Sequence, residues 1–356
     1  GLRIPLKQTA LVEVFPAWFL SRLNYNGYEA VFVFFVISGF LIAGNALNRW
    51  GELERIDLRA FYARRFARIV PCLLALISLL AILHLLALPD YTISRPGQSL
   101  PGAVWAAVGL HLNWYEGHTG YLPGNWDVLW SLSIEEVFYI GFPLVCLLTR
   151  RRWVLVPLLT VLALSMPWTH AALRGNEIWQ EKAYLPGMSA IAIGILGALL
   201  ASRWCLPSRR TSLLLGWLGA VGLVAATIDG AVMWHLLRDG YMLLLAVSAL
   251  CLLLACEQRQ RRGAWRAWPA LGWLRSWGRL SYEIYLSHMF VVFTVVQLYR
   301  ALDGDPRWGF AWYLLALPLC WLLGAAVERW LSAPCERWLR ASLLPSPLMQ
   351  TARGIR

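Results

Sequence analysis

The sequence predicts an all-α fold, a polytopic bundle of transmembrane helices. Of its 356 residues, 59% are hydrophobic and only 15% are charged, whereas soluble domains carry about 25% charged residues. Apolar runs long enough to cross a bilayer recur along the whole chain. The 21 Trp residues fit the same class, because indole rings favour the membrane–water interface.

Nine apolar runs are predicted to cross the membrane, because each approaches the length that a helix needs to span the hydrocarbon core. A further stretch, 101–115, opens with Pro101 and carries His111 and Asn113. Its apolar part is too short to cross, so we expect a re-entrant or interfacial segment there. The nine predicted spans are 28–48, 69–88, 132–149, 153–168, 185–202, 212–228, 241–256, 280–300 and 309–331.

Positive charge alternates from loop to loop. Loops 49–68, 150–152, 203–211, 257–279 and the tail 332–356 hold 22 Lys and Arg, whereas loops 89–131, 169–184, 229–240 and 301–308 hold 5. Such asymmetry marks the cytoplasmic side of a membrane, and here it is unbroken only if 101–115 does not cross. The basic loops and the C-terminus are therefore predicted to be cytoplasmic. The net charge of +12 then needs no nucleic acid as partner.

The predicted topology leaves residues 1–27 outside the membrane. No signal peptide precedes the first span, and the chain begins with Gly1 rather than Met. We therefore expect that a first transmembrane helix is missing from this sequence. Residues 1–340 are predicted to form a single integral-membrane domain, followed by a cytoplasmic tail over 341–356. No Cys or His spacing indicates a metal site.

An arginine-rich stretch, "FYARRFARIVP", leads into the second span. Arg64 and Arg68 share one helix face at i,i+4, and Arg65 and Arg68 are neighbours at i,i+3. Two interpretations stay open. The arginines are either a cytoplasmic anchor of the helix, or a clamp whose guanidinium groups bind phosphates as bidentate forks.

Two adjacent carboxylates open the third span in "SLSIEEVFYI". Ser133 and Glu136 have the spacing of a capping box, which predicts a helix start at Ser133. Glu135 and Tyr139 lie one turn apart on another face, and Ser131 extends that stripe only if the helix begins earlier. Glu135 is therefore either part of the helix cap or a functional group within the membrane, where ionisable side chains are costly.

A late span, "LSYEIYLSH", carries one polar stripe. Ser281, Tyr285 and His288 fall at i, i+4 and i+7 of an otherwise apolar helix. They either join helices through hydrogen bonds or line a polar cavity. In the first span, "VFVFFVISGFLI", the pair Ser38 and Gly39 predicts a small-residue face that lets another helix approach closely.

Together these four stretches resemble the acyltransferase 3 family of bacterial membrane enzymes. The family pattern has a small residue followed by Phe-Phe and Ser-Gly-Phe, an Arg-rich entry ending in Pro, Trp-Ser-Leu-Ser-x-Glu-Glu, and Ser-Tyr-x-x-Tyr-Leu-x-His. It is met here at Ala30–Phe40, Arg64–Pro71, Trp130–Glu136 and Ser281–His288. The resemblance implies a ten-helix bundle whose first helix is absent from this sequence.

Two positions depart from the family pattern. Many members carry Asp two residues before the Phe-Phe pair, where this chain has Phe32. The family's first helix also supplies a histidine that acts as catalytic base, and the first histidine here is His84. This departure agrees with a missing first helix, and the alternative is a chain that has lost its base.

The resemblance implies an O-acyltransferase of the bacterial inner membrane, multi-pass, with no tightly bound cofactor. Its donor would be acyl-coenzyme A, with acetyl-coenzyme A expected, and its acceptor a hydroxyl of a sugar or cell-envelope glycan. A transporter or flippase of a lipid-linked sugar and a catalytically inactive relative remain alternatives. The implied site has donor-binding Arg64, Arg65 and Arg68, catalytic Glu135, Ser133 and His288, and a cavity lining of Ser131, Tyr139, Ser281 and Tyr285.

Overall fold

The computed structural model describes residues 4–204, 208–228, 235–263 and 271–344 of the chain. These residues form helices and connecting turns without strands, so the all-α prediction is confirmed. The tail predicted over 341–356 lies outside the described residues from 345 onward, and helix α18 extends to Leu343.

The described residues contain nine helical segments that are long and apolar enough to cross a membrane, one for each predicted span. Several are built from two consecutive helices. In chain order they are α2 (Gly27–Trp50), α3 (Leu58–Leu85), α6 with α7 (Gly124–Asp127, Leu129–Thr149), α8 with α9 (Arg152–Leu164, Met166–Ala171), α10 with α11 (Glu177–Lys182, Tyr184–Arg203), α12 (Arg209–Ile228), α14 (Tyr241–Arg261), α16 (Ser281–Ala301), and α17 with α18 (Gly309–Val327, Ala333–Leu343), which are joined by a π-helical turn over Glu328–Ser332.

The stretch 101–115 forms two short helices, α4 (Leu100–Val108) and α5 (Leu112–Thr119), neither of which is long enough to span. The remaining described elements are also short. They are α1 (Ala17–Tyr25), α15 (Gly272–Arg279), and the 3₁₀ turns Leu6–Gln8, Ala10–Glu13, Leu53–Arg55, Arg238–Gly240 and Pro306–Trp308.

One predicted boundary was wrong in a way that matters for the site. The second span was expected to begin at 69, but α3 begins at Leu58, because the Asp57 side chain caps it by accepting from the Ala60 amide at 3.1 Å. The arginine-rich stretch is therefore the first part of a long helix, as the predicted i,i+4 spacing of Arg64 and Arg68 requires.

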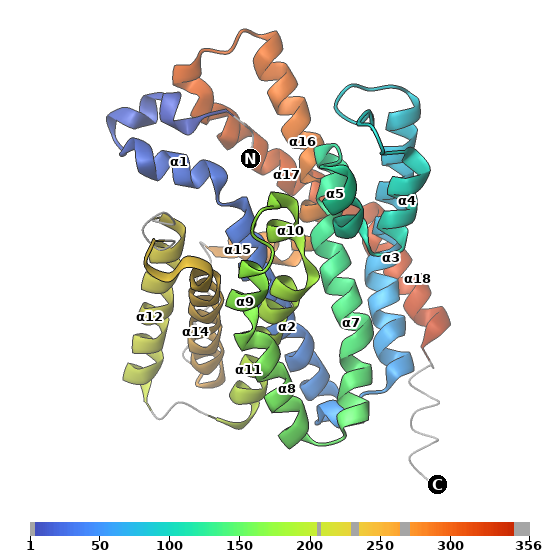
Figure 1. Cartoon of the computed structure of the whole chain (residues 1–356), viewed down its shortest axis with the longest axis vertical. Coiled ribbons are helices and arrows are strands. Elements are labelled where there is room, and N and C mark those ends of the chain that lie inside the picture. Colours follow the sequence, from blue (N-terminus) through green and yellow to red (C-terminus); the bar gives the residue numbers. More distant parts are fainter. Residues whose placement is uncertain (1–3, 205–207, 229–234, 264–270, 345–356) are drawn as a thin grey trace.

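Helices α2 and α11 cross at the centre of the bundle, with α12 and α14 on one side and α7 and α3 on the other (Figure 1). A Cβ on Gly39 would lie 2.0 Å from the Ile191 carbonyl oxygen, and one on Gly194 would lie 2.1 Å from that of Val36. Only glycine allows two backbones to approach this closely. The small-residue face predicted around Gly39 is thus confirmed.

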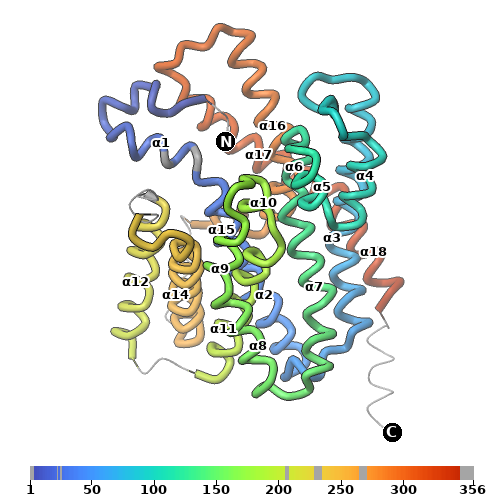
Figure 2. The backbone as a smooth tube through the Cα atoms, in the orientation of Figure 1, coloured from blue at the N-terminus to red at the C-terminus, as the bar shows by residue number. Residues whose placement is uncertain are grey.

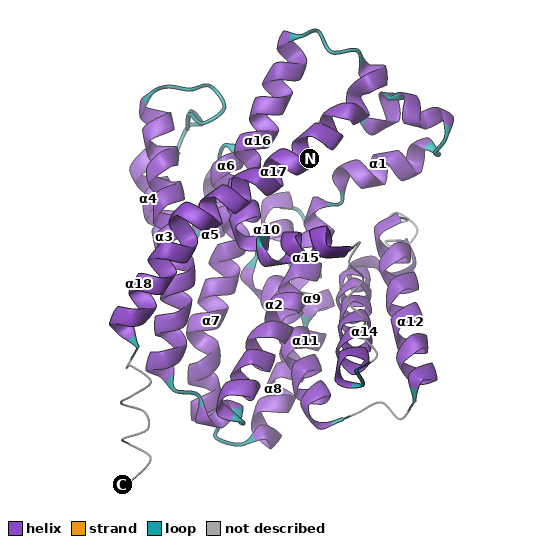
Figure 3. Cartoon of the chain, turned by 180° about the vertical axis from the view of Figure 1, so that it is seen from behind, coloured by secondary structure: helices purple, strands orange, loops and turns teal. Residues whose placement is uncertain are grey.

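The chain traverses the bundle repeatedly, as the tube in Figure 2 shows. The turns that join α2 to α3 and α7 to α8 lie at one end, and those that join α3 to α4 and α16 to α17 lie at the opposite end. From behind, α17 crosses the bundle obliquely and continues into α18, while α15 lies across the helices nearby (Figure 3).

The two ends of the bundle provide a direct test of orientation. Arg151 and Leu302 are both exposed, at the α7–α8 turn and at the end of α16. In a background without the seven native cysteines, a membrane-impermeant thiol reagent added outside intact cells should label Leu302→Cys and not Arg151→Cys. Labelling of Arg151→Cys alone would reverse the predicted topology.

Candidate functional site

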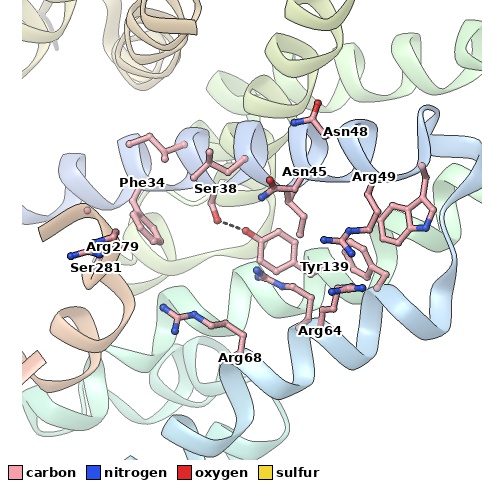
Figure 4. A pocket seen from close by; sticks show the side chains of 18 of the residues that line it. Phe34, Ser38, Asn45, Asn48, Arg49, Arg64, Arg68, Tyr139, Arg279 and Ser281 are labelled. Atoms are coloured by element: carbon pink, nitrogen blue, oxygen red, sulfur yellow. Dashed lines mark hydrogen bonds between the residues drawn. The ribbon is translucent and has the colours of Figure 1, made fainter. Parts of the chain in front are cut away.

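A cavity of about 820 Å³ lies between α2, α3, α7 and the segments around α15, α16 and α18 (Figure 4). Its described lining contains six arginines and no carboxylate. The arginines are Arg49, Arg64, Arg65, Arg68, Arg279 and Arg340. Serine, asparagine and tyrosine side chains complete the polar wall, and Ser38, Asn45, Tyr139 and Ser281 are among them. We refer to this cavity as the basic pocket.

All three arginines predicted to bind a donor line the basic pocket, but two of them are already paired with acids. Arg65 donates to Glu136 at 3.1 Å and lies over the Tyr139 ring, with its guanidinium carbon 3.8 Å from the ring centroid. Arg68 forms an ion pair with Glu283 at 2.8 Å, and Glu283 is fully buried. These contacts fix the two guanidinium groups in place.

Arg64 and Arg279 have no ion-pair partner among the described residues. The Nε atom of Arg64 is buried and lacks a hydrogen-bond partner there. The charges of Arg49 and Arg340 act on Arg64 and repel it. Uncompensated like charges around a cavity favour an anionic ligand, which can bind several guanidinium groups at once.

Sequence reasoning missed three of these arginines. Arg49 ends α2, Arg279 ends α15 and Arg340 lies in the last turn of α18. Each was counted as ordinary positive charge on the cytoplasmic side. Only the fold brings them to the same cavity as Arg64, because they lie far from one another in the sequence.

The capping-box interpretation of Ser133 and Glu136 was wrong. Helix α7 begins at Leu129, directly after the short helix α6, so Ser133 lies within the helix and its hydroxyl donates to the Leu129 carbonyl at 3.2 Å. Glu136 therefore has no cap to complete, and its carboxylate accepts from Arg65 instead.

Glu135 does not line the basic pocket itself but lies next to residues that do. Its side chain is 8% exposed, and its Oε1 atom is buried without a hydrogen-bond partner among the described residues. The Ser38 hydroxyl and the Arg65 guanidinium both interact with this carboxylate. Ser38 and Tyr139 are hydrogen-bonded to each other and line the pocket (Figure 4). Glu135 thus reaches the pocket through its neighbours on α2 and α3.

The polar stripe on α16 divides between two surroundings. Ser281 lines the basic pocket, whereas Tyr285 and His288 do not. The Tyr285 and Ser131 hydroxyls lie 2.6 Å apart in a hydrogen bond, and both are within donating distance of the Val128 carbonyl, at 3.0 and 3.4 Å. This contact joins α16 to α7 and brings together two side chains predicted to line one cavity.

The hydrogen bond of His288 defines its tautomer. Nδ1 lies 2.7 Å from the Tyr285 carbonyl oxygen. A carbonyl oxygen only accepts, so Nδ1 carries the proton and Nε2 of the neutral ring is left as an acceptor.

Phe32, at the position where many members of the resembled family have Asp, is 1% exposed and packs edge-to-face on Phe35. That position provides no charge here.

The bundle defines the class of this chain as a polytopic membrane protein, with a basic pocket beside a buried carboxylate. The profile of the acyltransferase domain matches residues 8–325. The chain therefore belongs to the acyltransferase 3 family, and the resemblance found in its four motifs is confirmed.

Two bacterial relatives match part of this chain. The peptidoglycan O-acetyltransferase OatA of Listeria monocytogenes is 28% identical over 175 residues, which cover 47% of this chain and 27% of that protein. The O-acetyltransferase OatA of Staphylococcus aureus is 33% identical over 139 residues, 36% of this chain and 21% of that protein. The matched regions span about a quarter of the length of these relatives. No solved structure matches the chain.

Proposed function

We propose that this chain transfers an acyl group, acetyl in the first instance, from a coenzyme A thioester to a hydroxyl of a cell-envelope glycan. The observation that carries the proposal is the basic pocket, with six arginines and no carboxylate in its described lining. Coenzyme A carries three phosphates, which require several cations at once. Both bacterial relatives are named as O-acetyltransferases, which supports an acetyl group, and the name of the Listeria monocytogenes protein specifies peptidoglycan, which supports a glycan acceptor.

Different residues of the basic pocket bind the donor and take part in the transfer of its acyl group. Arg64 and Arg279, which have no acidic partner in the described structure, bind the donor phosphates. The acyl end of the donor extends toward Ser38 and Tyr139, beside Glu135. In this proposal the thioester carbonyl lies near Arg65, whose charge stabilises the oxyanion that forms during transfer.

In net terms the reaction moves one proton, from the acceptor hydroxyl to the departing thiolate. The acceptor oxygen attacks the thioester carbonyl, its proton leaves, the new C–O ester bond forms and the C–S bond breaks, and the thiolate takes up a proton. Glu135 orients the acceptor hydroxyl or receives its proton, and Nε2 of His288 is a second acceptor for it. Ser133, bonded to its own helix, supports Glu135 through the backbone.

The alternative functions give different products in one experiment. The chain is reconstituted in lipid vesicles with coenzyme A that carries a radiolabelled acetyl group, together with a glycan acceptor. An acetylated glycan and free coenzyme A support the enzyme. Movement of the glycan across the bilayer without acetylation supports a transporter or flippase and contradicts our proposal. Absence of both products contradicts it in favour of an inactive relative.

Removing a donor-binding arginine should weaken binding of the donor specifically. Arg64→Gln is expected to raise the KM for acetyl-coenzyme A about tenfold or more, because a hydrogen bond to a charged group contributes about 1.5–3 kcal/mol. The KM for the acceptor should stay unchanged. Arg55→Gln is the matched control, since Arg55 is exposed, pairs with Glu52 and lies outside the pocket. Equal KM values for both variants would remove Arg64 from the donor site.

A further inference from the structure

A second cavity, of about 560 Å³, lies on the other side of the polar contacts between α7 and α16. It is bounded by the segments 89–98 and 121–127 and by the second half of α16. The residues that matter for its chemistry are Arg95, Gln98, Tyr121, Asp127, Phe293 and Arg300. We call it the outer cavity, after the side on which the charge pattern places these loops.

Helix α16 connects the two cavities. Ser281 lines the basic pocket, and Met289 is the first residue of this helix to line the outer cavity. They are separated by about two turns, or roughly 12 Å along the axis. Tyr285 and His288 lie on this intervening stretch, where Tyr285 is hydrogen-bonded to Ser131 of α7. Polar groups therefore continue from one cavity toward the other.

The outer cavity has an apolar floor and a polar rim. Met289, Val292, Phe293 and Val296 of α16 form the floor. Gly124 of α6 lets the backbone approach this floor, because a Cβ there would lie 2.9 Å from the methyl carbon of Met289.

Gln98 in the rim donates to the Gly120 carbonyl at 2.7 Å, while its Oε1 atom is buried without a partner in the described structure. Apolar walls with a few fixed polar groups are typical of small-ligand sites, and a sugar ring matches them with its apolar face and its hydroxyl edge.

The two acids in the described lining of the outer cavity both have hydrogen-bonding partners, but only Asp127 is paired with a cation. Asp90 accepts a hydrogen bond from Gln297. Asp127 forms an ion pair with Lys182, a buried residue that also pairs with Glu116 at 2.8 Å. Burial raises the pKa of the Glu116 carboxyl to about 8, with repulsion by Asp127 acting in the same direction and Lys182 opposing both. Asp127 is thus held by this cluster and is not free to bind a cation.

The arginines of the outer cavity are not neutralised. Arg95 and Arg300 line it and are exposed, and neither has an ion-pair partner among the described residues. The Arg95 guanidinium lies against Gly120, where a Cβ would approach its Nη1 atom to 2.8 Å, so glycine at this position lets the arginine fold over the rim. Arg95 and Arg300 together outweigh Asp90, the one lining carboxylate without a cation among the described residues, so the net charge offered to a ligand is positive.

We propose that the outer cavity is the acceptor subsite and that it binds a saccharide carrying an anionic group, a carboxylate or a phosphate, which Arg95 and Arg300 recognise. This inference rests on the proposed function and extends it to the class of acceptor. A carboxylate would belong to the glycan itself, and a phosphate to a lipid-linked precursor sugar.

Binding of three soluble sugars tests the proposal without any donor. The full chain in lipid nanodiscs is titrated with N-acetylglucosamine, with N-acetylmuramic acid, which adds a carboxylate, and with N-acetylglucosamine 1-phosphate. At least one acidic sugar should bind about tenfold more tightly than the neutral one. The double variant R95Q/R300Q should lose this preference. Arg307→Gln is the matched control, because Arg307 is an exposed arginine of the neighbouring α16–α17 turn outside the cavity.

Each outcome of the titration has a definite meaning. A preference for the muramic acid assigns the anionic group to the glycan, and a preference for the phosphate assigns it to a lipid-linked sugar. Equal binding of all three sugars, or a preference that survives in R95Q/R300Q, overturns the proposal. Unchanged coenzyme A binding by the double variant shows that it is folded. A chain that transfers acetyl groups without a charge preference contradicts only this inference, whereas charge-selective binding without transfer contradicts only the proposed function.

Discussion

Glu135→Gln is expected to lower the rate of acyl transfer by at least about a hundredfold, the range typical of a group that handles a proton in catalysis. The substitution keeps the shape of the side chain and removes its charge. Glutamine has the same heavy-atom shape as glutamate, so the amide adds no steric conflict at this buried position. Expression and thermal unfolding should therefore remain close to those of the unmodified chain. The rate is measured as acetyl transfer at saturating donor.

Glu136→Gln is the comparison that makes this result specific. On sequence alone Glu136 was expected to serve only the helix cap, but it is the partner of Arg65. The amide oxygen of glutamine can still accept from Arg65, so we expect a loss of about tenfold, smaller than that of Glu135→Gln. Equal and near-normal rates for the two variants would return Glu135 to a structural role.

The fold was largely predictable because its dominant signals are local. Hydrophobic length and loop charge located nine spans, and the shortness of 101–115 kept it from being counted as a tenth. Gly39 also had a local signal, since a small residue in an apolar run indicates close helix packing. These signals depend on neighbouring residues only, which is why a single sequence contains them.

The site was only partly predictable because its geometry depends on distant contacts. The capping-box spacing at Ser133 was misleading, since nothing local shows that α6 leads directly into α7. The pairing of Arg65 with Glu136 and of Arg68 with Glu283 joins different helices. The outer cavity likewise combines the segment 89–98 with α16, although about 200 residues separate them.

Arg68→Met is expected to destabilise the protein by about 3–5 kcal/mol, because it leaves Glu283 buried without its cation. The Arg68 guanidinium donates to Glu283 at 3.1 Å and to Ser332 at 3.1 Å, and the Ser332 hydroxyl donates to Glu283 at 2.6 Å. These bonds tie α3 to α16 and to the turn before α18. The loss should appear as a lower midpoint of unfolding in detergent.

Two further variants separate this structural role of Arg68 from donor binding. Arg68→Lys keeps the charge but has no planar guanidinium group to reach both Glu283 and Ser332. The stability of this variant should therefore lie between that of Arg68→Met and that of the unmodified chain. The double variant Arg68→Met/Glu283→Leu removes both charges of the pair, including the buried carboxylate, and should recover most of the lost stability. Arg64→Gln, which breaks no ion pair, should leave the midpoint unchanged while donor KM rises. If Arg68→Met instead unfolds normally and loses only donor affinity, Arg68 belongs with Arg64 among the phosphate-binding groups.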